Sequence, residues 1–167
     1  MSNINNKEIT ELLSKLGVTP KKYSLYMEAL THPSYANDNH LPYNYERLEF
    51  LGDSVISLIV ANFLYNNFPN AKVGTLSKTR TMMVQSKSIV IVASKIDLKK
   101  YLNIGKSLSN TTDYSKILED AFEALIGAIY LDQGIMVAAK VIVDTICKEY
   151  KEDHFKGNVD YKTEFQE

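Results

Sequence analysis

Two segments of the sequence carry acidic side chains at helical spacing inside otherwise apolar runs. With about 100° of rotation per residue, Glu46, Glu49 and Asp53 lie on one helix stripe about 60° wide. In the second segment, Asp120 and Glu123 are three positions apart and share a face in the same way. Like charges at this spacing repel each other, and the repulsion grows where the local dielectric is low. Each stripe therefore requires a compensating positive charge.

A divalent cation would supply that charge, because hard ions such as Mg²⁺ take carboxylate oxygens as ligands. Ala124 and Gly127 continue the second acidic face, and such small residues let a neighbouring helix approach closely. If the two helices pack through these faces, four carboxylates meet in one site. Neither stripe contains a basic residue that would neutralise them, and Arg47 points elsewhere. The pattern thus favours a metal site.

Two other interpretations fit parts of the pattern. Acidic side chains on a single helix are most often ordinary surface residues, but here two apolar segments show the same arrangement. A di-iron helical bundle requires Glu-x-x-His pairs. None of His32, His40 and His154 follows a glutamate at that spacing, so redox iron is disfavoured.

The net charge of the 167-residue chain conceals an uneven distribution. Nineteen Lys and Arg residues against twenty Asp and Glu give −1, which by itself does not support a nucleic-acid partner. Residues 72–116, however, contain nine basic and two acidic residues, a local balance of +7 that leaves −8 for the remainder. This basic segment is typical either of a solvated helical surface or of a face that binds a polyanion.

Composition also restricts the setting of the protein. A lone Cys147 allows no intrachain disulfide, which favours a reducing, cytoplasmic environment. The N-terminus is polar, unlike a signal peptide. Apolar stretches such as 55–64 end well short of the ~20 residues that cross a bilayer, so we expect no membrane partner.

The hydropathy pattern predicts an all-α fold. Residues 45–66 are apolar all round, which favours a buried central helix, and 37–44 form a polar loop. The β-branched run at 89–92 is also typical of a strand, but no second strand pattern exists to pair with it. Gly17, Thr75 and Ser86 are expected at helix caps. The predicted helices cover residues 9–16, 23–30, 45–66, 75–84, 88–95, 97–102, 115–131 and 135–150.

Four motifs give the sequence a family resemblance. The run ERLEFLGDS at 46–54 resembles the signature of the ribonuclease III family, the double-stranded-RNA endonucleases. LTHPSY at 30–35, GTLS at 74–77 and DAFEALIGA at 120–128 are similar to that family in order and spacing. The resemblance covers essentially the whole chain. It implies an all-α ribonuclease III endonuclease domain that is homodimeric.

The resemblance also assigns roles to the acidic residues. It implies that Glu49, Asp53, Asp120 and Glu123 hold the catalytic Mg²⁺, with Asp53 and Glu123 as catalytic residues and Mn²⁺ as an alternative ion. Glu46 matches an additional acid at the cleavage site. The implied reaction is hydrolysis of double-stranded RNA to 5′-phosphate and 3′-hydroxyl ends with two-nucleotide 3′ overhangs, in rRNA and mRNA processing. The basic segment would then contact RNA phosphates.

Phe50 and Val73 differ from what a core position or the family pattern would predict. Phe50 lies beside the acidic stripe, away from the apolar face, and the matching family residue inserts into a socket on the other subunit. Packing within its own subunit is the alternative. Val73 occupies a position where family members carry Glu. Because this is not one of the four core acidic positions, we expect activity to survive.

The resemblance further divides the chain. Residues 1–153 are expected to form the endonuclease domain, and 154–167 a linker that leads into a double-stranded-RNA-binding domain absent from this chain. Two rival functions remain at this point. One is a catalytically inactive dimer of the same fold that binds duplex RNA, and the other is a helical interaction domain unrelated to RNA.

Overall fold

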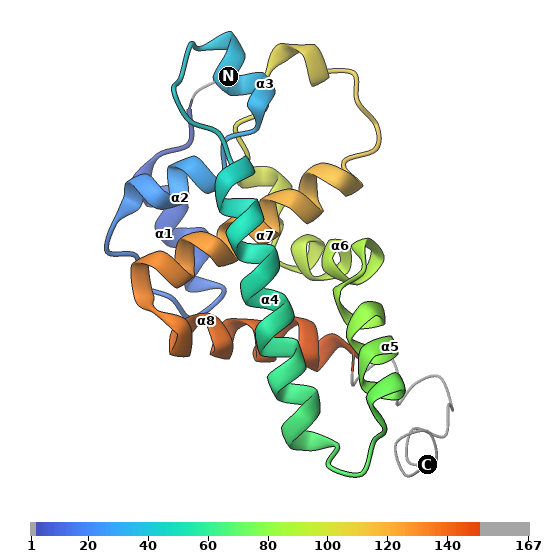
Figure 1. The fold of residues 1–167 in the computed structure, drawn as a ribbon. Coiled ribbons are helices and arrows are strands. Elements are labelled where there is room, and N and C mark those ends of the chain that lie inside the picture. Colours follow the sequence, from blue (N-terminus) through green and yellow to red (C-terminus); the bar gives the residue numbers. More distant parts are fainter. Residues whose placement is uncertain (1–2, 151–167) are drawn as a thin grey trace.

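The computed structural model describes residues 3–150, and within that range it is helical, with a single isolated bridge between Thr31 and Asn103 in place of any strand. Figure 1 shows the long helix α4 crossing in front of α7, with α1 and α2 on one side and α5 and α6 on the other. The α-helices are α1 (Asn6–Ser14), α2 (Tyr23–Ala29), α3 (Pro33–Asp38), α4 (Glu46–Asn67), α5 (Val73–Val84), α6 (Ser86–Lys95), α7 (Ser115–Gln133) and α8 (Ile135–Ile142). Short helices η1 (Leu98–Tyr101) and η2 (Lys106–Leu108) are 3₁₀, and η3 (Val143–Cys147) is a π-helix. The all-α prediction is confirmed.

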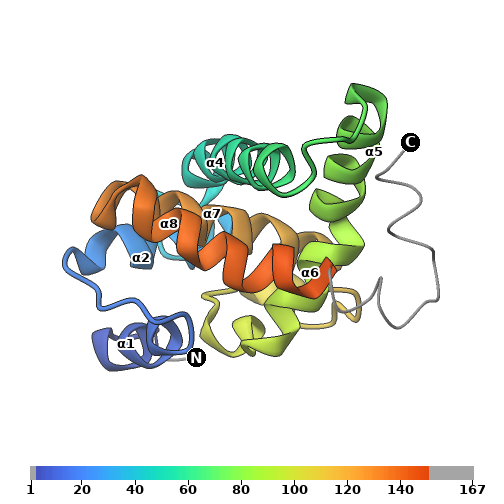
Figure 2. The same cartoon turned by 90° about the horizontal axis from the view of Figure 1, so that it is seen from below.

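The most deeply buried helix is α7, rather than the expected α4. Seen from below in Figure 2, α7 lies between α4 and α8. Nearly every residue of α7 from Ile117 to Ile129 is buried, because α2, α4, α6 and α8 all pack around it. Helix α4 buries one side and leaves Phe50, Leu58 and Tyr65 exposed on the other. An apolar composition all round therefore did not mean burial all round.

Several boundaries differ from the sequence-based prediction. Helix α3 begins at Pro33 and ends within the expected loop, and it was missed because six residues with one buried position show no periodicity. Helix α5 begins two residues before Thr75, and α6 begins at Ser86, so neither residue is the N-cap. The expected helix over 135–150 changes to π geometry after Ile142. The run at 89–92 is helical, as predicted.

Helix α4 satisfies a simple length-and-composition test for a membrane span. It has 22 residues and a mean hydropathy of 1.5 over its most apolar window, contrary to the expectation that no stretch is long enough. A core helix of a soluble protein passes the same test, and 44% of this window is buried inside the fold. Packing against α7 thus accounts for its apolar character.

Two glycines set the distance between α4 and α7. A Cβ on Gly52 would overlap the backbone carbonyl of Glu123, and a Cβ on Gly127 would overlap that of Leu48. The backbones therefore touch at this crossing, as the small residues predict. The first acidic turns of α4 come to lie beside Asp120 and Glu123 as a result.

We expect Gly52→Ala and Gly127→Ala each to lower the free energy of unfolding by about 3 kcal/mol or more, because two packed backbones must separate. Thermal denaturation should show Tm reduced by roughly 10 °C. Gly74→Ala is the matched control, since it lies in a helix with nothing within 4 Å of the added Cβ. Equal Tm values for all three variants would contradict a backbone contact at the crossing.

Candidate metal centre

Three carboxylates meet where α4 crosses α7. Glu49, Asp120 and Glu123 each offer an oxygen, and these oxygens all lie within 4.8 Å of one another. Asp120 and Glu123 are only 8% and 9% exposed. Buried carboxylates are rare unless they are paired or bind a cation. These three residues are called the acidic cluster below.

The two other acids of the α4 stripe, Asp53 and Glu46, lie at the edge of the acidic cluster. Asp53 is exposed and is not part of the acidic cluster, although its charge helps to raise the pKa of Glu123. Glu46 is exposed at the first turn of α4. The structure therefore brings together three of the four expected metal ligands and places the fourth beside them. Their roles as ligands stay predictions.

A lysine contacts the acidic cluster, contrary to the sequence-based expectation that neither stripe contains a basic residue. Lys116 Nζ lies 2.8 Å from Asp120 Oδ1 and 3.8 Å from Glu119 Oε2. The expected stripe began at Asp120, whereas the helix begins one turn earlier and puts Lys116 on the same face. This lysine is largely exposed, so solvent screens much of its charge.

The approach of Lys116 does not satisfy the buried oxygen. Asp120 Oδ1 has no aligned hydrogen bond to any group in residues 3–150. An ion pair with a largely exposed lysine offsets only part of the cost of burying this oxygen. A cation held between the three side chains would remove that cost, so the residues present fit a divalent ion.

Burial and mutual repulsion raise the pKa values of two members of the acidic cluster. The pKa of Glu123 rises from 4.5 to about 8, first because the carboxyl is buried and then because of the charge of Asp53. The pKa of Glu49 rises to about 7, through burial and then through a hydrogen bond with Asp120. Without a cation, the site therefore retains protons at neutral pH.

Two aromatic side chains beside the acidic cluster were not singled out from the sequence. Burial, followed by the charge of Asp120, raises the pKa of the Tyr45 hydroxyl above its usual range. The His32 ring packs edge-on against Tyr45, with centroids 5.5 Å apart. His32 belongs to the motif at 30–35, and Tyr45 directly precedes the motif at 46–54. Neither is an acidic residue, so the search for acidic stripes did not find them.

Phe50 projects away from the fold. Its side chain is 80% exposed, which contradicts the alternative in which it packs within its own subunit. Phe50 also lines a shallow hollow of about 530 Å³, in which leucines such as Leu25 and Leu131 lie beside the charged residues Glu28, Glu46 and Arg47. A large exposed aromatic at such a hollow is typical of a protein–protein contact.

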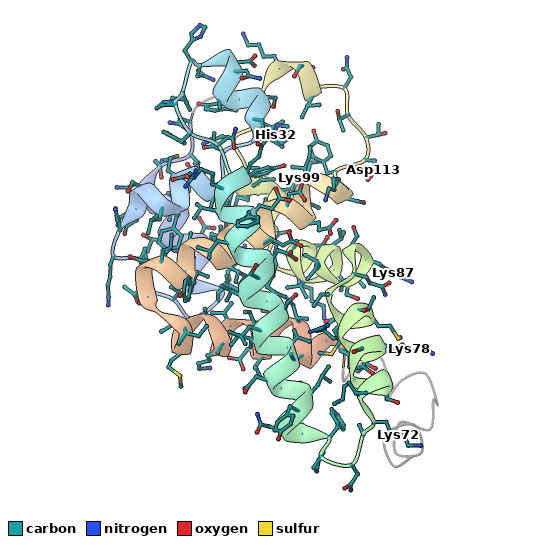
Figure 3. The ribbon with its side chains drawn as sticks, viewed as in Figure 1. His32, Lys72, Lys78, Lys87, Lys99 and Asp113 are labelled. Atoms are coloured by element: carbon teal, nitrogen blue, oxygen red, sulfur yellow. The ribbon has the colours of Figure 1, made fainter. Side chains whose placement is uncertain are left out.

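Three lysines of the middle segment lie along one edge of the molecule. Figure 3 shows Lys72, Lys78 and Lys87 projecting along the edge formed by α5 and α6, with Lys99 closer to the start of α7. Lys99 Nζ lies 4.0 Å from the centre of the Tyr114 ring, and this pair lines a hollow of about 830 Å³ with Lys106. These lysines are exposed, so the structure is also consistent with an ordinary solvated surface.

The raised pKa of Glu123 makes stability depend on pH when no divalent ion is present. Because the folded state holds this proton more tightly than the unfolded chain, the contribution is fully present below about pH 4.5 and lost as pH rises to about 8. In EDTA, we expect Tm to fall by several degrees between pH 5 and 8, and Glu123→Gln to flatten that slope.

Adding Mg²⁺ at pH 8 should raise the Tm of the wild-type protein, because the ion binds the folded state. The Glu123→Gln variant should show a smaller increase. Parallel pH slopes for the two proteins in EDTA would show that Glu123 does not titrate in this range.

Comparison with known proteins agrees with the fold and the motifs. Residues 22–150 match the family model described as Ribonuclease-III-like. Ribonuclease 3 of Mycoplasmoides gallisepticum is 44% identical over 166 residues, which is 99% of this chain and 25% of that protein. Ribonuclease 3 of Phytoplasma mali is 42% identical over 160 residues, covering 95% of this chain and 70% of that protein.

A solved structure extends the comparison to the fold. The nuclease domain of ribonuclease III from Campylobacter jejuni superimposes with a TM-score of 0.80 at 35% identity, over 86% of this chain and 99% of that one. The chain thus spans a quarter of the Mycoplasmoides relative but nearly all of a nuclease domain. Sequence and fold agree over the helices that carry the acidic cluster, and the chain belongs to the ribonuclease-III-like family.

Proposed function

We propose that this chain is the nuclease domain of an endoribonuclease that hydrolyses phosphodiester bonds of double-stranded RNA with Mg²⁺, or with Mn²⁺ in its place. The observation that carries the proposal is the acidic cluster of Glu49, Asp120 and Glu123, two of whose members are nine-tenths buried. Oxygen-only ligands favour these hard ions over softer metals. Membership of the family supports the choice of RNA as substrate.

Each acidic residue has a separate part in the proposed reaction. Glu49, Asp120 and Glu123 would hold the ion, which supplies charge stabilisation at the phosphate and lowers the pKa of a water molecule when bound. Asp53, exposed at the rim, would orient the attacking water by accepting a hydrogen bond, and Glu46 would act beside it. The water oxygen bonds to phosphorus as the bond from phosphorus to the 3′ oxygen breaks, and the proton that the water loses is balanced by one taken up at the 3′ oxygen, which leaves 5′-phosphate and 3′-hydroxyl ends.

The position of Val73 supports retained activity. This residue is exposed at the start of α5 and contributes no atom to the acidic cluster. The family resemblance places Glu at this position, so its replacement removes one carboxylate without removing a proposed metal ligand. Hydrolysis should therefore persist.

The distribution of charge supports a duplex substrate. Proteins recognise A-form RNA mainly through its shape and its phosphates, which basic side chains contact without reading the base sequence. Lys72, Lys78 and Lys87 line one edge of the domain, and Lys99 lies towards the start of α7 (Figure 3). We propose that this edge follows the RNA backbone. Lys116 would exchange Asp120 for a phosphate once a cation occupies the acidic cluster.

We also propose that the domain works as a homodimer. Phe50 and the hollow beside it belong to one surface, so a two-fold axis would place the Phe50 ring of each subunit in the hollow of the other. The Campylobacter jejuni structure is described for flexibility in the region involved in dimer formation, which supports such an assembly. Two acidic clusters would then cut both strands and leave two-nucleotide 3′ overhangs.

The remaining parts of the proposal rest on the family resemblance. We place the protein in the cytoplasm, where a reducing environment suits its single, buried Cys147, and in rRNA and mRNA processing. The expected linker at 154–167 and the end of the endonuclease domain at 153 lie outside the described residues. No membrane partner is proposed, since α4, the one helix within residues 3–150 that is apolar enough to span a bilayer, packs against α7.

A catalytically inactive dimer that binds duplex RNA is the second candidate. Two observations favour it: Asp53 does not join the acidic cluster, and Lys116 contacts Asp120. Retention of a carboxylate at all four core positions favours the enzyme instead. Cleavage assays separate the two candidates.

Incubation with duplex RNA and Mg²⁺ should yield cleavage that EDTA abolishes. Glu123→Gln should lower the cleavage rate at least about 100-fold, because a metal ligand is lost. Asp144→Asn is the matched control, since it removes an exposed carboxylate that pairs with Lys140 on α8 and contributes nothing to the acidic cluster. RNA binding without cleavage by the wild-type protein would select the inactive dimer.

Phe50→Asp should convert the dimer to a monomer, because the aromatic contact with the leucines is lost and the new carboxylate would lie near Glu28 and Glu46 of the other subunit's hollow. Light scattering measures the mass directly. Met136→Asp is the control, since Met136 is exposed to the same degree, 79% against 80%, but lies on α8. An unchanged dimer after Phe50→Asp would refute the proposed contact.

A further inference from the structure

His32 has one ring nitrogen fully occupied by local structure. Its Nδ1 accepts a hydrogen bond from the backbone N–H of Ser34 at 3.0 Å and lies 2.7 Å from Ser34 Oγ. Ser34 Oγ in turn accepts the backbone N–H of Gly105 at 2.9 Å, which leaves its own proton to donate to Nδ1. Nδ1 is therefore an acceptor in both contacts, and this network places the proton of the neutral ring on Nε2.

The other ring nitrogen of His32, Nε2, takes no part in these local hydrogen bonds. Nε2 makes no hydrogen bond to any residue that the structure describes. Burial lowers the pKa of His32 against the opposing charges of Asp120 and Glu46, and in the neutral ring Nε2 carries the proton and is a donor. The half-buried ring is thus held in one tautomer with its free donor unused.

The surroundings of His32 belong to the acidic cluster. The ring packs on Tyr45, whose hydroxyl is close enough to Asp120 for that carboxylate to raise its pKa. Asp120 and Glu46 are the charged groups that act on His32. Figure 3 shows His32 where α3 meets the start of α4. The ring therefore lies next to the acidic cluster, where the proposed function places a phosphate of the RNA.

We propose that His32 is a substrate-binding residue whose Nε2–H donates a hydrogen bond to a phosphate oxygen of the RNA strand next to the scissile bond. This inference rests on the proposed function, and it assigns one contact within it. A role restricted to capping α3 would explain the Nδ1 contacts but would make no use of Nε2.

Two substitutions separate the two nitrogens. His32→Asn keeps a side-chain acceptor that can cap α3 but removes the Nε2 donor. His32→Gln removes the short capping acceptor and places an amide N–H at about the reach of Nε2. If His32 only caps α3, His32→Asn should retain activity and His32→Gln should lose it. If Nε2 contacts the RNA, His32→Gln should retain activity and His32→Asn should lose it.

The experiment measures the Kd for a fixed RNA duplex by fluorescence anisotropy in the Glu123→Gln background, where cleavage is suppressed. The kcat/KM is then measured with Glu123 intact, and Tm reports the fold. We expect His32→Asn to weaken RNA binding and lower kcat/KM about tenfold, mainly through KM, with Tm nearly unchanged. His32→Gln should lose several degrees of Tm yet retain most of the RNA affinity.

Binding within twofold of wild type for His32→Asn would overturn the proposal, as would losses of affinity that follow Tm in both variants. Failure of the proposed function has a different signature. Wild-type protein that binds the duplex without cleaving it would refute the reaction, while the Kd comparison would still decide the role of His32. Wild-type protein that does not bind duplex RNA would overturn both.

Discussion

The contact between the backbones of α4 and α7 determines everything else about the site. Gly52 and Gly127 allow these helices to approach until each lies against the backbone of the other. At that separation, one turn of α4 and one turn of α7 must share the same small volume. The side chains there are Glu49, Asp120 and Glu123, and the acidic cluster is a direct consequence. If the residues at this crossing served only to stabilise the fold, apolar side chains would be expected there in place of carboxylates.

The electrostatic cost of the arrangement indicates what the site is for. Two carboxyl groups with pKa values raised to about 7 and 8 are unfavourable in a metal-free protein at neutral pH. The nearby Lys116 offsets only part of that cost, because it is exposed and leaves Asp120 Oδ1 without an aligned hydrogen bond. A divalent cation resolves both problems at once. Strongly perturbed acids gathered in one place are typical of functional sites.

The sequence predicted the helices whose apolar residues repeat regularly. It did not predict features that depend on tertiary contacts. Long helices such as α4 and α7 were found because their apolar residues repeat over several turns, whereas α3 has only Ala36 buried and leaves no pattern. The small residues of α7 correctly predicted a close approach. Lys116 was missed because the acidic stripe was taken to begin at Asp120. Phe50 was expected beside the acidic stripe and away from the apolar face, and its 80% exposure agrees, whereas the exposure of Leu58 and Tyr65 depends on what packs against α4.

The divalent cation between α4 and α7 is the central claim, and anomalous scattering from crystals grown with Mn²⁺ tests it most directly. The predicted result is a peak between Glu49, Asp120 and Glu123, with carboxylate oxygens at about 2.2 Å and Lys116 displaced from Asp120. A map with no peak at the acidic cluster, and with Lys116 still paired to Asp120, would contradict the claim.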